Sequence, residues 1–177
     1  MWMNIWTDNV SGRQEMNGSK DLKTIIYFKG VYDTLDLFTD HLIEAFESMG
    51  YGTFVYHTAN EEVSKKMLLR LLDESQEFAV VTFNNLGYNL SFEQSEAAEE
   101  EKKPEEHNIW NYFHIPYIDI LMYHPFHYEK PLCNMPETAV ILCTDRNHEK
   151  YIRRFFKNIH QTDFLPHAGV ELGHRSE

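Results

Sequence analysis

The chain has 177 residues, enough for one domain with a substantial core and too few for two domains of ordinary size. Its residues are 42% hydrophobic and 14% aromatic, but no apolar run approaches the roughly 18 to 20 residues that cross a bilayer, so we expect no transmembrane segment. The net charge of −12 repels phosphate backbones, which excludes nucleic acid as an expected partner.

Residues 1–21 form an irregular, polar lead-in with an Asn-Gly-Ser turn signal near its end. They lack a positively charged start followed by an apolar stretch, so they do not have the pattern of a secretory signal. The two cysteines, Cys133 and Cys143, have no Cys or His companion at zinc-finger spacing. We therefore expect reduced thiols, a cytoplasmic location and no metal site.

After the lead-in, strand and helix signals alternate. Residues 24–28 are a β-branched and aromatic run of strand length. Apolar residues at spacings of three and four predict an amphipathic helix over residues 35–49, with Asp33 and Thr34 as candidate caps. Residues 53–56 predict the second strand.

The middle of the chain continues this alternation up to an acidic interruption. Asn60 is a candidate cap for a helix over residues 63–72, and residues 78–83 predict the third strand. A surface loop is expected over about residues 89–106, because residues 93–106 hold seven acids and two lysines and nothing that can pack. The side chains expected to be buried on the helix are Val63, Met67, Leu68, Leu71 and Leu72.

The last third predicts a short helix near residues 109–113 and two buried strands over residues 117–122 and 139–143. A helix over residues 147–159 and an edge strand over residues 162–165 follow. The helix face expected to be buried consists of Tyr151, Ile152, Phe155, Phe156 and Ile159.

Strands that alternate with helices across short turns indicate right-handed βαβ crossovers. The expected fold class is α/β, with a Rossmann-like, doubly wound, mostly parallel sheet of five to six strands and helices on both faces. We expect one such domain over residues 22–170, followed by a tail, residues 171–177, that begins a linker.

Polar side chains follow most of the predicted strands. In a doubly wound sheet, ligands bind beyond the carboxyl ends of the strands, so we expect these residues along one rim. The candidates are Lys29, Gly30, Tyr32 and Asp33 after the first strand, Asn84 and Asn85 after the third, Tyr123, His124 and His127 after the fourth, Asp145, Arg146 and His148 after the fifth, and His167 after the sixth.

Each of these groups has a structural reading beside the functional one. The Lys29-Gly30 pair fits a turn or a ligand contact. His124 and His127 fit general base catalysis, contact with a sugar hydroxyl or metal ligation, but His124 also fits a hydrogen bond to the backbone where Pro125 stops the strand. Asp145 fits the N-cap of the helix that follows.

Several enzyme classes are disfavoured because their motifs are absent. The sequence has no Gly-x-Gly-x-x-Gly, no phosphate loop and no Gly-x-Ser-x-Gly, which argues against an NAD-binding domain, a phosphate-loop NTPase and a covalent hydrolase. The remaining histidines that fall on expected helices or turns without a companion group, and are expected at the surface or satisfied, are His41, His57, His107 and His160.

Three segments together resemble a known family. They are IDILMYHPFH at residues 118–127, VILCTDRNHEKYI at residues 140–152 and DFLPHAG at residues 163–169. With the Rossmann-like rhythm of residues 22–170, they resemble the amino-terminal domain of bacterial GT-B glycosyltransferases of the group related to spore-maturation-like sugar transferases.

In GT-B enzymes the amino-terminal domain mainly receives the acceptor and the carboxyl-terminal domain binds the nucleotide-sugar. The chain ends at Glu177, near the place where such an enzyme enters its second domain. The resemblance therefore implies an acceptor-side domain that binds a sugar or glycoconjugate, needs a separate donor-binding domain and its nucleotide-sugar, and transfers no sugar unaided.

The same resemblance implies that the cleft between the two domains is lined by His124, His127, Asp145, Arg146 and His167. Of these, His124 or His167 is the best candidate for contact with the reacting sugar. Two other readings stay open. One is a non-enzymatic Rossmann-like module that senses a ligand or binds a protein. The other is a self-contained small-molecule enzyme that uses the histidines of the rim.

Overall fold

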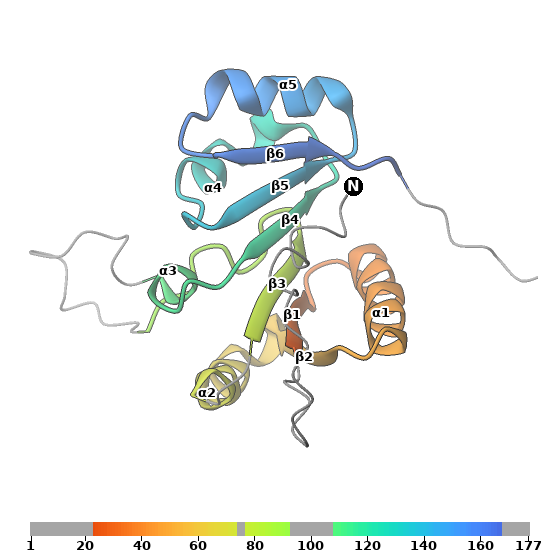
Figure 1. Cartoon of the computed structure of the whole chain (residues 1–177), viewed down its shortest axis with the longest axis vertical. Coiled ribbons are helices and arrows are strands. Elements are labelled where there is room, and N and C mark those ends of the chain that lie inside the picture. Colours follow the sequence, from red (N-terminus) through yellow and green to blue (C-terminus); the bar gives the residue numbers. More distant parts are fainter. Residues whose placement is uncertain (1–22, 74–76, 93–107, 168–177) are drawn as a thin grey trace, which may run out of the picture.

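The computed structural model describes residues 23–73, 77–92 and 108–167 (Figure 1). Six parallel strands form a single sheet in the order β2-β1-β3-β4-β5-β6, which confirms the α/β, Rossmann-like fold expected from the sequence. The strands are β1 (Lys23–Lys29), β2 (Gly52–His57), β3 (Glu77–Phe83), β4 (Tyr117–Leu121), β5 (Ala139–Cys143) and β6 (Gln161–Phe164).

The strand order creates one topological switch point. From β1 the chain adds β2 on one side, and every later strand is added on the other side of β1. The carboxyl ends of β1 and β3 therefore flank the point where the direction reverses, and open α/β sheets bind their ligands in the crevice at such a point.

Helices cover both faces of the sheet, but unequally. α1 (Asp33–Ser48) lies on one face, and the other helices pack on the opposite face (Figure 1). Those helices are α2 (Glu61–Leu72), α3 (Ile109–Tyr112), α4 (Glu129–Cys133) and α5 (Arg146–Phe155).

The alternation of side chains along the strands divides the core into two layers. The larger layer lies under α2 to α5 and contains the fully buried Trp110, Tyr117 and Ile141. The smaller layer lies on the α1 side and contains Tyr27 and Ile120. The sequence predicted each of these strands, and every one except β6 contributes an apolar side chain to at least one of these layers.

Two expected helix stripes are partly wrong. On α2 the buried side chains are Ser64, Leu68 and Leu72, whereas Val63 and Met67 are 59% and 55% exposed. The buried track runs at intervals of four residues, and Ser64 belongs to it because its hydroxyl exchanges hydrogen bonds with the backbone of His57.

The end of the last helix also differs from the expectation. α5 ends at Phe155, whose ring is 57% exposed, while Ile152, Phe156 and Ile159 are buried. Phe155 lies at the flank of the buried track, with the Arg154 guanidinium 5.2 Å from its ring centre. It is therefore not part of the core.

Asn60 and Asp145 lie at the N-cap positions where the sequence predicted them, but of these two only Asp145 makes a side-chain cap bond. The Asp145 carboxylate accepts a hydrogen bond of 2.6 Å from the Asn147 N–H and caps α5. α1 instead has Tyr32 at its N-cap, and Asn60 makes no side-chain cap bond to α2.

The structure also contains short elements that the sequence did not predict. They are α4 and two 3-10 turns, Thr58–Asn60 and Pro125–Tyr128, which are too short to carry a periodic signal.

The start of the expected acidic loop belongs to the core. Leu90 is buried, its carbonyl accepts the Ile109 N–H at 2.9 Å, and Ser91 pairs with Asn108 in an isolated antiparallel bridge. Residues 93–107, which include the acidic stretch, lie outside the described part of the chain, as do the lead-in, residues 1–21, and the tail, residues 171–177.

Candidate functional site

Three tyrosines gather at the carboxyl edge of the sheet near the switch point. Tyr32 follows β1 and Tyr123 follows β4, with 56% and 58% of their surfaces exposed. Tyr128 closes the 3-10 turn after β4 and is half-buried. Its pKa is raised by burial and then by the electrostatic influence of Tyr32, Tyr123 and Asp119, so Tyr128 lies within electrostatic range of each of them.

Two consecutive buried asparagines, Asn84 and Asn85, lie at the same edge of the sheet as these tyrosines. Asn84 and Asn85 directly follow β3, and both have left-handed backbone angles, with φ of 49° and 65°. Adjacent non-glycine residues in this region are uncommon, and such conformations cluster at functional sites. Both side chains are buried, and the Asn84 side-chain oxygen accepts the Met122 N–H at 2.9 Å, which joins the end of β3 to the end of β4.

Asp119 of β4 contacts Asn85 and is not among the site residues that the sequence predicted. It is fully buried in β4, and its Oδ1 accepts the Asn85 N–H at 2.7 Å. Burial raises the pKa of its carboxyl to about 7, against the smaller opposing effect of that hydrogen bond. The available signal was a lone acid inside the apolar run Ile118-Asp-Ile-Leu.

Several buried side-chain atoms of Asn84, Asn85 and Asp119 have no hydrogen-bond partner among the described residues. Among the described residues, no hydrogen bond reaches Asp119 Oδ2, the Asn84 side-chain nitrogen, or either side-chain atom of Asn85. Buried polar atoms in native proteins are normally satisfied by protein, water or ligand. The switch point therefore combines exposed aromatic rings with buried hydrogen-bonding capacity.

His124 and His148 form a second group next to the tyrosines. Their ring centres are 4.8 Å apart, and the His124 ring lies 5.1 Å from Tyr151 of α5. His124 Nδ1 accepts the Phe126 N–H at 3.1 Å, which is the structural role that the sequence left open. Nε2 therefore carries the proton of the neutral ring. The pKa of His148 is lowered, mainly by burial, against the opposite effect of Asp145.

His167 does not join this group. It lines a cavity of about 320 Å³ on the face that carries α1, together with Phe38, His41 and Thr144. His124 packs on α5, which covers the opposite face. The two histidines expected to contact one reacting sugar thus share an edge of the sheet but lie in different environments. His41, expected to stand without a companion, lines the same cavity as His167.

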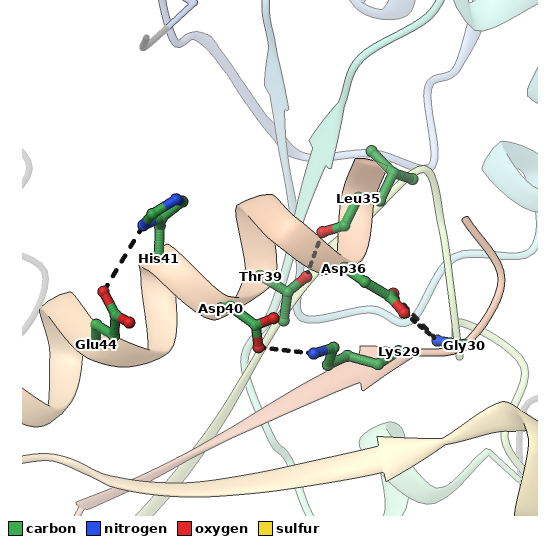
Figure 2. A network of polar contacts seen from close by, with 8 residues as sticks. All are labelled: Lys29, Gly30, Leu35, Asp36, Thr39, Asp40, His41 and Glu44. Atoms are coloured by element: carbon green, nitrogen blue, oxygen red, sulfur yellow. Dashed lines mark hydrogen bonds and ion pairs between the residues drawn. The ribbon is translucent and has the colours of Figure 1, made fainter. Parts of the chain in front are cut away.

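Two carboxylates of α1 bind Lys29 and Gly30 (Figure 2). The Gly30 N–H donates to both carboxylate oxygens of Asp36, at 3.1 and 3.0 Å. Lys29 Nζ lies 2.7 Å from Asp40 Oδ1. The first turn of a Rossmann-like sheet is where a phosphate would sit, and here an acid of the chain itself occupies the backbone donor.

Replacing Asp36 with alanine is expected to lower the free energy of unfolding by about 1 kcal/mol, because the Gly30 N–H loses its charged acceptor. Asp33→Ala is the matched control, since Asp33 is also an acid in the first turn of α1. Urea unfolding of both variants checks the prediction. Equal losses would show that only the charge near the helix start matters.

The remaining predicted residues lie at the same edge. Asp145 caps α5, and the Arg146 guanidinium stacks 4.2 Å from the centre of the Phe164 ring. His127 is exposed, with its ring 5.9 Å from that of Phe126. By topology, the predicted residues closest to the switch point are those that follow β1 or β3, namely Lys29, Gly30, Tyr32, Asp33, Asn84 and Asn85, while Arg146 lies toward β6.

The described residues hold no group of three or more His, Cys, Asp or Glu side chains that could bind a metal ion. Within the same residues no helix is both long and apolar enough to span a membrane. Comparisons with protein-family models, with curated proteins and with solved structures found no match to this chain.

Proposed function

We propose that the chain binds a hydroxyl-rich ligand, a sugar or glycoconjugate acceptor, at the carboxyl edge between β1, β3 and β4. In this proposal it is the acceptor-side domain of a GT-B glycosyltransferase-like protein. The observation that carries it is that the exposed Tyr32 and Tyr123 follow β1 and β4 at the same sheet edge as the buried, partly unpaired Asn85 and Asp119.

The chemistry of these residues suits a neutral sugar. Tyrosine offers an apolar ring face to the C–H side of a pyranose and a hydroxyl to its O–H groups. The unpaired amide of Asn85 is buried and offers both a donor and an acceptor, which a water that bridges to a sugar hydroxyl can meet.

The charges favour a neutral group over a phosphate. Asp36 holds the Gly30 N–H and Asp40 pairs with Lys29, so the first turn presents carboxylates where an anion would bind. In the proposal the nucleotide-sugar is therefore bound by a separate domain. His124, beside Tyr123 and with Nε2 not used by the Phe126 N–H, is the candidate to contact the reacting hydroxyl.

A panel of methyl glycosides, screened by saturation-transfer NMR and measured by calorimetry, tests this function. For the glycosides that bind, Tyr123→Ala is expected to weaken binding about fivefold or more, because one aromatic contact contributes about 1 kcal/mol or more. Tyr112→Ala is the control, because Tyr112 is similarly exposed, at 65%, but belongs to α3 at the opposite edge.

Two results would contradict the proposal: no binding by any glycoside at millimolar concentration, or equal weakening by both substitutions.

A protein-binding module is the second candidate function. It is favoured by the exposed apolar side chains Val31, Tyr32, Tyr123 and Phe126, which all follow β1 or β4 at this edge.

A further inference from the structure

Half of one sheet face carries an apolar surface over which none of the described helices packs. In β4 and β5, alternate side chains point away from α5, and Leu165 joins them after β6. The side chains of this surface, which we name the β4–β6 face, are Ile118, Ile120, Met122, Val140, Leu142 and Leu165.

Among the described residues, α1 is the helix that packs on this side of the sheet. It contacts β1 and β2, and Phe38 extends it to Phe83 of β3, with ring centres 6.3 Å apart. The cavity of about 320 Å³ lies where this cover ends, between Phe38 and Leu42 of α1 and Ile120 of β4. On the β4–β6 face Ile120 and Leu142 are buried, whereas the other four side chains are only half-buried. Parallel sheets are normally covered on both faces, so we expect a further segment over these four.

Three longer stretches of this chain lie outside the described residues, and their compositions differ. Residues 93–107 offer only two alanines as apolar side chains, and residues 168–177 offer little beyond Val170 and Leu172. Residues 1–22 begin Met-Trp-Met-Asn-Ile-Trp, with five large apolar side chains in six positions. Tryptophan has the largest apolar surface to lose from water, so this segment gains most from burial.

The segment is long enough to reach the face. The strand register places Ile26 level with Val80, Tyr117 and Ala139. Leu142 is therefore three strands across from β1 and about six residues up from Lys23, a distance of about 25 Å at about 4.8 Å per strand and 3.3 Å per residue. The sixteen residues between Trp6 and Lys23 can span about 50 Å when extended.

We infer that residues 1–6 pack in cis on the β4–β6 face, with a tryptophan ring in the cavity beside Phe38 and Ile120. The cavity has the volume of about ten liquid waters, which leaves room for an indole ring. His41, Thr144 and His167 at the cavity wall supply polar atoms that can meet the indole N–H.

The test uses the full chain labelled with 5-fluorotryptophan, whose three ¹⁹F signals come from Trp2, Trp6 and Trp110. Trp2→Phe and Trp6→Phe assign them. A soluble gadolinium chelate broadens exposed rings, and Trp110, which is fully buried, is the internal standard. We expect at least one of Trp2 and Trp6 to be broadened several-fold less than free fluorotryptophan, at every protein concentration.

Leu165→Asp should release the shielded ring and increase its broadening several-fold, because it places a charge on the β4–β6 face. Val63→Asp, on the exposed side of α2, should not. If Leu165→Asp exposes Trp110 and so unfolds the chain, Leu165→Asn takes its place. Broadening of both rings as in free fluorotryptophan overturns the inference. So does shielding that disappears on dilution, which would indicate a second copy on the face.

Discussion

Replacing Asp119 with asparagine is expected to remove a large pH dependence from the stability of the fold. The carboxyl has a pKa of about 7 in the folded chain, against its ordinary value of 3.8, so between these values the folded chain holds a proton that the unfolded chain has released. The contribution of this carboxyl to the free energy of unfolding is therefore largest below pH 4. It falls as the pH rises to 7 and is constant above that. Three units of pKa correspond to about 4 kcal/mol.

The measurement is urea unfolding of both proteins at intervals from pH 4 to pH 8. The free energy of unfolding of Asp119→Asn minus that of the parent should rise by about 4 kcal/mol across this range. The asparagine oxygen still accepts the Asn85 N–H, so the local hydrogen bond is kept. Asp163→Asn, at an exposed site on β6, measures what any lost surface carboxylate produces. A difference that stays constant with pH would show that Asp119 is charged in the folded state throughout.

Gly87→Ala is expected to lower the free energy of unfolding by about 3 kcal/mol or more, through backbone strain and overpacking together. Gly87 has a φ of +76°, and a Cβ built there lies 2.1 Å from the Phe28 ring. That ring is held between Tyr56, at 5.0 Å, and Trp110, at 6.1 Å between centres. Trp110 in turn donates to the Gly87 carbonyl at 2.7 Å, so neither side can move freely.

Gly50→Ala separates the two causes. Gly50 has a similar φ of +88°, but no heavy atom lies within 4 Å of its added Cβ, so the cost there is about 1 to 2 kcal/mol of backbone strain alone. Urea unfolding of both variants at one pH gives the contribution of the Phe28 clash by difference. Equal losses at the two glycines would show that the Phe28 ring can give way.

The sequence predicted the strands well and the helix faces less well, for physical reasons. A strand in a covered parallel sheet needs a continuous apolar run, and such runs stand out at residues 78–83 and 139–143. A helix stripe depends on where the chain docks, so Val63 and Met67 matched the helical period and still face solvent. α4 has five residues and a proline, too few for a period.

The candidate site was predicted in its edge but not in its grouping. A strand end tells which edge of the sheet a residue reaches, but not toward which face the following loop turns. His124 turns to α5 and His167 to the cavity beside α1, although both follow strands of one sheet. Asp119 was missed because apolar neighbours define a strand, and the acid among them was read as part of the run.

The proposed function requires ligand binding at the switch point. An NMR titration of the amide-assigned chain with the tightest-binding methyl glycoside tests this requirement most directly. We predict that the largest amide shifts fall at Gly30 to Tyr32, at Asn84 and Asn85, and at Tyr123 to His127. Saturable binding whose largest shifts fall instead at α3, or at the cavity beside His41 and Leu165, would contradict the proposed site.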